Sequence, residues 1–406
     1  MVNTQDTHYD VIIIGAGMVG ATTACLAAQI VDKKGASALK IGLIESRSTP
    51  PFDSDQFDPR VAALTEKTRS LLECCSVWEE IQAKRVAPYK AMQIWDAEGT
   101  GQINFNCRDV HLPNLGHIVE ASAIITSLMT YIEGLPNVDI HCPTKVEHYQ
   151  IEEDAVILRL NNQHSISASL LIAADGANSS VRQQFQFATR EWDYQQQAIV
   201  TTITTEQPNQ QTAWQRFMPT GPLALLPLND HGNLQRCSIV WSQDTAESER
   251  LMALSDEDFC EQLSVASEYC LGQVTAVDKR FLIPLRQRHA IDYAKSRVAL
   301  IGDAAHSIHP LAGQGVNLGF ADAQVLVEEI QRAFSRSVDL GELSVLKRYQ
   351  RRRKPENLAA MATMEGFKRL FGSDSSALRL MRNAGMSGVD QIAPLKNQLI
   401  KKAMGL

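Results

Sequence analysis

The hydrophobic pattern at the start of the chain predicts a strand, a turn, a helix and a second strand. Residues 10–14 are a β-branched run of the kind found in buried parallel strands. Residues 15–20 are glycine-rich, residues 21–30 are rich in Ala and Leu, and residues 41–44 are again apolar. This order favours a right-handed crossover, so we expect the two strands to lie parallel in one sheet.

The pattern changes near residue 194, where short alternating segments replace longer elements. Before that point the expected elements are a loop over 46–58, helices over 65–75 (capped by Thr65) and about 120–133, and strands over 156–160 and 166–173. After it the expected strands are residues 199–205, 214–218, 223–228 and 237–241. Asn, Gly and Pro separate these strands, which predicts an antiparallel sheet and a second domain.

The last part of the chain has mainly helical periodicity. The segment Ser255–Asp258 has the pattern of a capping box, and it predicts a helix to about Tyr269. Residues 298–301 have the character of a buried strand. The chain after Gly319 is expected to be helical, with breaks at Pro355 and Gly372.

Composition narrows the class of protein. The chain has 406 residues, of which 44% are hydrophobic, so more than one domain is expected. Its net charge of -7 argues against nucleic acid as the main partner. The eight cysteines form no C-x-x-C pair, which predicts reduced thiols. The polar residues 1–10 do not have the pattern of a secretory signal, so none is expected, and no apolar run is long enough to span a membrane. We therefore expect a cytoplasmic protein, and a peripheral contact with the inner membrane is an open alternative.

The glycine-rich turn has the spacing G-x-G-x-x-G, which is typical of dinucleotide binding. Gly15 allows a tight turn, Gly17 allows a pyrophosphate to approach the backbone, and Gly20 allows close packing of helix and strand. Glu45 ends the second strand, where a carboxylate can accept hydrogen bonds from the adenosine ribose. A carboxylate also repels a 2′-phosphate, which favours FAD or NAD over NADP. The predicted contacts are Gly15, Ala16, Gly17, Met18, Gly20, Glu45 and Ser46.

Two later strands also end in motifs that carry a carboxylate. Residues 170–174 run into Asp175-Gly176, and residues 298–301 run into Gly302-Asp303. His-Pro-x-x-G-x-G-x-N follows over residues 309–317. With its three motifs in this order, the chain resembles the class A flavoprotein aromatic hydroxylases, the group of para-hydroxybenzoate hydroxylase.

Within that group the chain is most similar to the ubiquinone-biosynthesis hydroxylases. The similarity rests on Asp-Pro-Arg-Val-Ala-Ala-Leu at 58–64, Trp-Asp-Tyr-Gln at 192–195 and Pro-Leu-Ala-Leu-Leu-Pro-Leu at 222–228. One departure is Val119-Glu120-Ala121, where the family usually has Val-Glu-Asn. The loss of the Asn amide puts one local hydrogen bond in doubt.

The resemblance implies an α/β fold with three parts. A Rossmann-type FAD-binding domain is expected to be discontinuous, over residues 1–75, 100–182 and 284–335. An inserted substrate domain built on an antiparallel sheet would cover residues 76–99 and 183–283, and a C-terminal helical region would cover 336–406.

The resemblance also assigns roles to single residues. Arg60 would contact the phosphate or ribityl region of FAD, Asp303 the ribityl hydroxyls, and Asp175 a motif that serves FAD and nicotinamide. The flavin ring would lie against Gly313, Gly315, Val316 and Asn317. Pro310 would face the reactive edge through its carbonyl, and His309 is expected to line the site rather than act as a base. His306 is expected to be a structural hydrogen-bonding residue.

The predicted floor of the substrate pocket comes from the antiparallel sheet. The apolar candidates, each of which is equally compatible with a purely core role, are Trp214, Phe217, Leu225, Pro227 and Trp241. An apolar floor suits a polyprenylated phenol better than a small acid, and no arginine is obviously placed to hold a substrate carboxylate.

The resemblance implies a complete reaction. NADH or NADPH reduces FAD, the reduced flavin and O2 give a C4a-hydroperoxide, and this oxidant hydroxylates a polyprenylated phenol or benzoquinol in ubiquinone biosynthesis. The alternatives are another FAD-dependent oxidoreductase, such as a reductase or halogenase, and a non-catalytic FAD-bound subunit of a quinone-biosynthesis complex. A halogenase would carry Trp-x-Trp-x-Ile-Pro, which the sequence lacks.

Two C-terminal segments could serve as contact surfaces. The basic run 347–354 is expected to be a solvated helical face, with anionic lipid or a partner as the alternative. Residues 395–406 alternate Lys with apolar residues, which fits docking to a membrane or a subunit as well as ordinary packing. A homo-oligomer is a further possibility.

Overall fold

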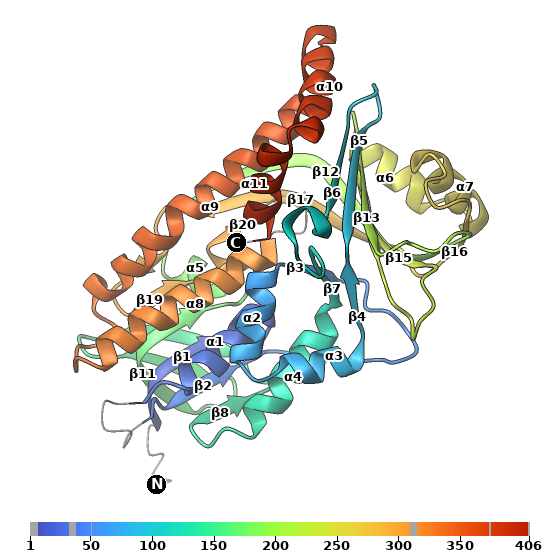
Figure 1. Cartoon of the computed structure of the whole chain (residues 1–406). Coiled ribbons are helices and arrows are strands. Elements are labelled where there is room, and N and C mark those ends of the chain that lie inside the picture. Colours follow the sequence, from blue (N-terminus) through green and yellow to red (C-terminus); the bar gives the residue numbers. More distant parts are fainter. Residues whose placement is uncertain (1–6, 32–37, 50, 309–314, 373–374, 405–406) are drawn as a thin grey trace.

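The computed structural model describes residues 7–31, 38–49, 51–308, 315–372 and 375–404, and it contains three sheets (Figure 1). The first sheet consists of β1 (Thr7–Ile14), β2 (Ile41–Ile44), β8 (Val138–His141), β9 (Val146–Ile151), β10 (Val156–Leu160), β11 (Ser165–Ala173), β18 (Ala294–Lys295) and β19 (Val298–Leu300). The second consists of β5 (Ala91–Asp96), β6 (Gln102–Asn106), β12 (Thr189–Thr205), β13 (Thr212–Met218), β14 (Gly221–Pro227), β15 (Arg236–Asp244), β16 (Val274–Val277), β17 (Phe281–Ala290) and β20 (His306–Ser307). The third consists of β3 (Val61–Leu64), β4 (Val86–Tyr89) and β7 (Gly116–Glu120).

The helices connect and cover these sheets. They are α1 (Met18–Ala28), α2 (Glu66–Cys74), α3 (Trp78–Lys84), α4 (Ala121–Glu133), α5 (Ser180–Gln184), α6 (Thr245–Met252), α7 (Asp256–Ala266), α8 (Gly315–Phe334), α9 (Leu343–Phe371), α10 (Ser376–Gln391) and α11 (Ala393–Ala403). Two short 3-10 helices, η1 (Cys107–Val110) and η2 (Gly302–Ala304), complete the list.

The first sheet is the predicted Rossmann unit. Its strands follow the order β18-β19-β11-β1-β2-β8, and β1 pairs in parallel with both β2 and β11. Helix α1 returns the chain between the two N-terminal strands and packs against α4 and α8. The βαβ prediction is confirmed, although the helix begins at Met18 instead of residue 21. Strand β2 and the last four residues of β1 are fully buried, and α1 packs against both strands.

The second sheet confirms the predicted antiparallel strands. It has the order β20-β17-β12-β15-β14-β13-β5-β6, with β16 paired to β12. Strand β12 is longer than predicted and runs for 17 residues. Strand β6 lies in this sheet, whereas the predicted boundary at residue 100 assigned it to the FAD-binding part. The domain boundaries themselves remain predictions.

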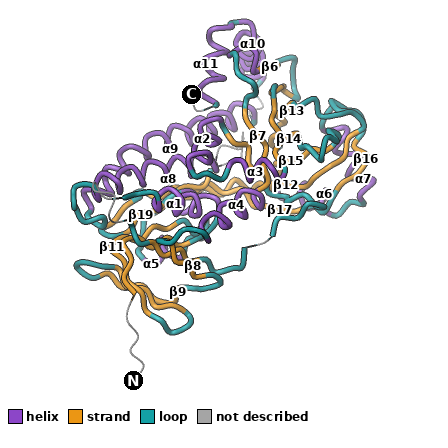
Figure 2. The backbone as a smooth tube through the Cα atoms, turned by 60° about the horizontal axis from the view of Figure 1, so that its bottom comes forward, coloured by secondary structure: helices purple, strands orange, loops and turns teal. Residues whose placement is uncertain are grey.

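Helices cover the two faces of the second sheet differently. On one face, α6 and α7 pack on an apolar cluster that includes Trp241 and Phe259. On the other face, the ends of α9 and α10 pack on Phe217 through Phe371 and Met386. Figure 2 shows α6 and α7 at the outer end of the molecule, with α8 and α9 above the first sheet. The predicted cap of α7 is confirmed, since the Ser255 hydroxyl accepts a hydrogen bond from the Asp258 N–H at 3.1 Å.

The predicted break at Pro355 is wrong. Helix α9 runs through this residue and is 29 residues long. Proline removes one backbone hydrogen bond from a helix interior. Buried side chains on both sides of it, Tyr349 and Asn357, hold the helix against the first sheet and α8. The predicted end at Gly372 is confirmed.

All eight cysteines are free thiols, as predicted, and Cys74 is exposed. None of the described helices combines the length and the apolar character that a membrane crossing requires.

Candidate active site

The glycine-rich turn connects β1 to α1 in a conformation that two of its glycines require. Gly15 has a φ of +99°, and a Cβ there would lie 2.5 Å from the Ala174 carbonyl oxygen. A Cβ on Gly20 would lie 1.9 Å from the Gly15 carbonyl oxygen. Both positions therefore exclude a side chain. A Cβ on Gly17 would meet no atom of the described residues within 4 Å, so these residues leave the space above the start of α1 open.

Glu45 braces this turn from the end of β2. Its Oε2 accepts a hydrogen bond from the Ala16 N–H at 2.9 Å, and its Oε1 accepts one from the Arg47 N–H at 2.9 Å. The Ser46 hydroxyl also donates to Glu45, at 3.3 Å. The open space, the free N–H groups at the start of α1 and the nearby carboxylate suit a pyrophosphate with its adjoining ribose.

Arg182 connects the segment after Asp175-Gly176 to the segment after Gly302-Asp303. Asp175 Oδ2 accepts a hydrogen bond from the Ser180 N–H at 2.8 Å. The other oxygen of Asp175 is buried and has no hydrogen-bond partner among the described residues. Arg182 donates from Nη1 to the Ala304 carbonyl at 2.9 Å, which ties this segment to η2.

Asp303 lies in a tight turn at the end of β19. The turn begins at Gly302, whose φ is +57°. Desolvation raises the pKa of the Asp303 carboxyl, and His306 acts in the opposite direction. His306 itself is buried, with Nε2 at 2.6 Å from Asp322 Oδ2. The prediction that His306 is a structural hydrogen-bonding residue is confirmed.

Hydrogen bonds tie the start of α8 to β3 and to the start of α2. Asn317 Oδ1 accepts hydrogen bonds from the Thr65 N–H at 3.1 Å and the Thr68 hydroxyl at 2.7 Å. Its Nδ2 donates to the Ala63 carbonyl at 2.8 Å. Gly315 and Val316 form the first turn of this helix. The predicted residues His309, Pro310 and Gly313 lie outside the described residues.

Arg60 lies in the segment before β3, and its predicted contact with FAD remains a prediction. Its side chain is 63% exposed, and its N–H donates to Asp58 Oδ1 at 2.9 Å. Asp58 Oδ2 accepts the Ser122 N–H at 2.9 Å and so caps the start of α4. Asp58 thus caps α4 although it lies 64 positions away in the sequence. The helix begins at Ala121, where the sequence has Ala in place of the expected Asn. A buried pair, Glu120 with Arg85 at 2.9 Å, holds the segment in place.

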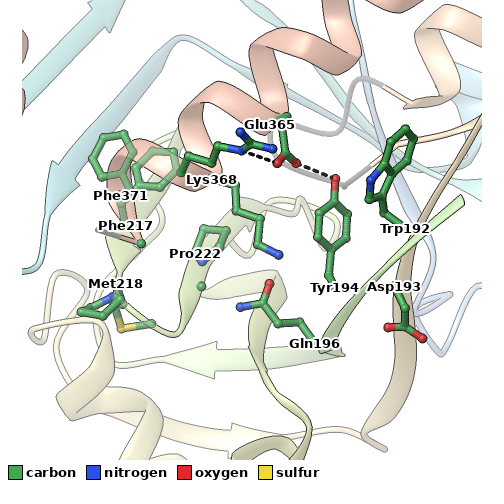
Figure 3. Close-up of a pocket in the computed structure, with 14 residues that line it drawn as sticks. Trp192, Asp193, Tyr194, Gln196, Phe217, Met218, Pro222, Glu365, Lys368 and Phe371 are labelled. Carbon is green, nitrogen blue, oxygen red and sulfur yellow. Dashed lines mark hydrogen bonds and ion pairs between the residues drawn. The ribbon is translucent and has the colours of Figure 1, made fainter. Parts of the chain in front are cut away.

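A cavity of about 400 Å³ lies between the second sheet and the end of α9 (Figure 3). Trp192 and Tyr194 enter it from β12, and Phe217 faces it from β13. Phe217 stacks on Phe371 of α9 with ring centroids 4.0 Å apart. Four of the residues that line this cavity are thus aromatic, and four others are charged: Asp193, Glu365, Lys368 and Arg369.

Three polar side chains of this cavity, those of Tyr194, Glu365 and Lys368, contact one another. The Tyr194 hydroxyl donates to Glu365 at 3.3 Å and also contacts Gln287. Lys368 Nζ lies 3.7 Å from the centroid of the Tyr194 ring. Burial raises the pKa of Tyr194 above its usual value, and burial lowers the pKa of Lys368. Tyr194 is thus a neutral hydrogen-bond donor at physiological pH.

A second cavity, of about 350 Å³, adjoins the first along α9. The two share Trp192, Glu365 and Arg369. The second continues past Met361 to His289 on β17. His289 is in register with His306 of β20, so this cavity ends beside the segment that follows Asp303.

Comparisons with known proteins agree with this geometry. A family model described as an FAD binding domain matches residues 8–363. The 3-demethoxyubiquinol 3-hydroxylase of Escherichia coli K12 is 34% identical over 398 residues, which are 98% of each chain. The chain belongs to the FAD-dependent ubiquinone-biosynthesis hydroxylases. The human ubiquinone biosynthesis monooxygenase COQ6 is 32% identical over 98% of this chain and 92% of that protein.

A solved structure supports the fold of this FAD-dependent monooxygenase. The p-nitrophenol 4-monooxygenase PnpA from Pseudomonas putida DLL-E4 superposes with a TM-score of 0.78 at 18% identity. The match covers 98% of this chain and 99% of that chain. The α/β fold predicted for the hydroxylase family is therefore confirmed.

The structure places the predicted pocket residues of this hydroxylase on two different faces. Trp214, Leu225 and Trp241 are buried in the cluster under α6 and α7, away from the cavities beside α9. Pro227 is in register with Cys237, which belongs to the same cluster. Phe217 alone among the five candidates lines the cavity of Figure 3. Successive side chains of a strand alternate between the two faces of a sheet. Because both faces of this sheet carry apolar residues, the sequence pattern could not show which face lines the cavity.

Several cavity residues were missed in the sequence. Tyr194 lies inside the segment Trp192–Gln195 that already resembled the family, so that similarity was a usable signal. Glu365, Lys368 and Phe371 belong to α9, and no local pattern shows which sheet this helix will cover.

Proposed function

We propose that this chain hydroxylates the aromatic ring of a polyprenylated phenol or benzoquinol in ubiquinone biosynthesis, using O2 and either NADH or NADPH. The observation that carries the proposal is the match along nearly the whole chain to relatives named for ubiquinone biosynthesis, at 34% and 32% identity. Similarity of this extent covers both the FAD-binding cleft and the sheet that faces it.

The residues of the cleft fit FAD. The open space at Gly17 and the start of α1 would hold the pyrophosphate, Glu45 the adenosine ribose, and Asp303 the ribityl chain. The exposed Arg60 would meet the phosphate or ribityl region. When bound, FAD supplies electron transfer from the reductant and activation of O2.

The two cavities beside α9 favour a hydrophobic substrate. Together they form an elongated space whose walls include Phe217, Phe371, Met361 and Leu358. In this proposal they take the prenyl tail, while the ring lies at the flavin end near His289. A packed apolar wall orients the ring and excludes water from the reacting centre.

A bulky substitution on α9 tests this placement. Ala362 lines the second cavity, and Ala359 lies on an exposed part of the same helix. We expect Ala362→Trp to raise the KM for a long-chain prenylated phenol about tenfold and to leave that for a short-chain analogue within about twofold. Ala359→Trp should change neither value. Equal losses for both chain lengths would contradict the placement of the tail.

We also propose a peripheral contact of the C-terminal helices with the inner membrane, for a protein that is otherwise cytoplasmic. Helix α10 projects from the body of the molecule (Figure 1), and it exposes Leu380 and Met381 by 73% and 69%. Replacing both by Ser should reduce flotation with anionic vesicles, whereas Val265→Ser on α7 should not. Unchanged flotation would favour the alternative partners, a second copy of the chain or a quinone-biosynthesis complex.

A further inference from the structure

A buried carboxylate on α8 lies directly behind the turn that carries Asp303. Asp322 is completely buried, and its two oxygens face different parts of the fold. Oδ2 accepts a hydrogen bond from the Gly302 N–H at 3.1 Å and lies 2.6 Å from His306 Nε2. Gly302 and His306 flank Asp303 in the sequence, so one oxygen atom holds both ends of the turn.

The other oxygen of Asp322 is held by α9. Arg353 donates from Nε to Oδ1 at 2.8 Å, and Asn357 donates from Nδ2 to the same atom at 3.2 Å. Arg353 Nη2 also donates to the Asn357 side chain at 2.9 Å and to the Leu318 carbonyl at 3.4 Å. Arg353 and Asn357 are thus held by each other, and Arg353 also by Leu318.

The burial of this pair distinguishes it from the other ion pairs of the basic run on α9. Arg353 is 2% exposed and belongs to residues 347–354, which were expected to form a solvated face. Arg352, its neighbour in sequence, is 41% exposed and pairs with acidic residues of α8. Burial alone would raise the pKa of Asp322, but His306 and Arg353 outweigh it and lower the pKa overall. A charged carboxylate therefore stands behind the turn.

We infer that Asp322 and Arg353 are positioning residues that fix the Asp303 turn and the start of α8 as one unit around the flavin. A single carboxylate joins η2, β20 and α9, and Arg353 extends the connection to Leu318, one residue after Asn317. Helix α9, which carries Arg353, is in this way part of the FAD site. The inference rests on FAD binding and is independent of the substrate.

The Asp322–Arg353 pair has a second expected effect, on the electrostatics of bound FAD. Breaking a buried pair leaves one charge without its partner. Asp322→Asn leaves the cation, which favours a reduced, anionic flavin and should shift the midpoint potential in the positive direction. Arg353→Gln leaves the anion and should shift it in the negative direction. General loosening of the site would shift both variants in the same direction.

The experiment measures FAD affinity and flavin potential without substrate. The proteins are the full chain, Asp322→Asn, Arg353→Gln, the double variant, and Arg351→Gln as a control at an exposed position of α9. FAD is titrated into the apoprotein by fluorescence, and the potential is measured on the reconstituted protein. We expect each single variant to bind FAD about tenfold more weakly, with the double variant no weaker than the weaker single one. The control should match the wild type.

Two results would overturn the inference. One is an FAD Kd within about twofold of wild type in both single variants. The other is a potential shift of the same sign in both. If Asp322→Asn does not fold, Arg353→Lys replaces it: this variant keeps the charge but lacks the second nitrogen that reaches Leu318. Its FAD Kd should still rise, and an unchanged value would equally overturn the inference. Since no substrate is present, these outcomes are separate from the fate of the proposed hydroxylation.

Discussion

Two glycines of the first turn accept a side chain very differently, although they belong to one motif. At Gly20 the obstacle is the backbone of the turn itself, 1.9 Å from an added Cβ. At Gly17 the protein leaves space, and the obstacle would be the cofactor. Gly20 is therefore needed for folding, whereas Gly17 is expected to be needed for binding the cofactor.

This difference predicts opposite phenotypes for two alanine substitutions. Gly20→Ala should lower the free energy of unfolding by about 3 kcal/mol or more, because backbone atoms must move. Gly17→Ala should cost less than about 1 kcal/mol and weaken FAD binding about tenfold. Denaturant unfolding of the apoprotein and FAD titration measure the two effects. A Gly17→Ala protein that binds FAD normally would place the pyrophosphate elsewhere.

A second prediction at this scale concerns His117 and pH. Burial, together with Arg69, lowers the pKa of His117 to about 4, while the unfolded chain has an ordinary histidine. Between these two pKa values the unfolded state binds a proton that the folded state does not. The contribution of His117 to the free energy of unfolding is therefore complete above about pH 6.5 and is lost as the pH falls towards 4. His117→Phe keeps a ring against Trp78 and removes the titration.

The measurement compares the free energy of unfolding at about pH 7 and about pH 5. Wild type should lose about 1–2 kcal/mol more than His117→Phe over this interval. Equal losses in the two proteins would mean that His117 titrates normally in the folded state.

At the scale of elements, local signals in the sequence were sufficient for most helices and strands but not for their partners. Thr65 and Ser255 marked helix starts because a hydroxyl cap acts within its own turn. Pro355 misled because long-range packing outweighs a local rule. The cap of α4 by Asp58 joins residues 64 positions apart, so the sequence carries no local sign of it.

A buried ion pair is one of the contacts that tie helix α10 to the second sheet. Arg382 donates to Asp96 of β5 from Nε at 2.7 Å and from Nη2 at 2.9 Å, and both side chains are 1% exposed. Arg382 also donates to the Phe371 carbonyl at the end of α9. The pair thus anchors α10 to the second sheet and to α9 together.

Asp96→Ala should release α10 without unfolding the first sheet. Asp96→Ala removes the nearest partner of the buried Arg382 and leaves it the longer contact with Glu98 at 3.5 Å. Breaking a buried pair costs about 3–5 kcal/mol, which exceeds the local stability expected of a peripheral helix. Hydrogen exchange should accelerate over residues 376–391 and stay slow over residues 11–14. Asp109→Ala removes an exposed contact to Lys396 and serves as the matched control. Unchanged protection of α10 in Asp96→Ala would show that other contacts hold it.

At the scale of the whole molecule, three motifs far apart in the sequence meet at the ends of parallel strands. Their order and the resemblance they carry were enough to predict the fold class and the FAD cleft. The course of α9 was not predictable, because its pairing with both the flavin turn, through Arg353, and the aromatic cavity, through Phe371, depends on tertiary packing. For the same reason the sequence could not separate Phe217 from Trp214.

The most direct test of the central claim is incorporation of isotope-labelled O2. The purified, FAD-loaded protein would be incubated with a polyprenylated phenol, labelled O2 and either NADH or NADPH, and the products analysed by mass spectrometry. The account predicts one labelled oxygen atom on the aromatic ring, in proportion to the reductant consumed, with Ala359→Trp active and Ala362→Trp impaired on the long-chain substrate. Reductant consumption that yields only peroxide, with no labelled ring product from any prenylated phenol, would contradict it.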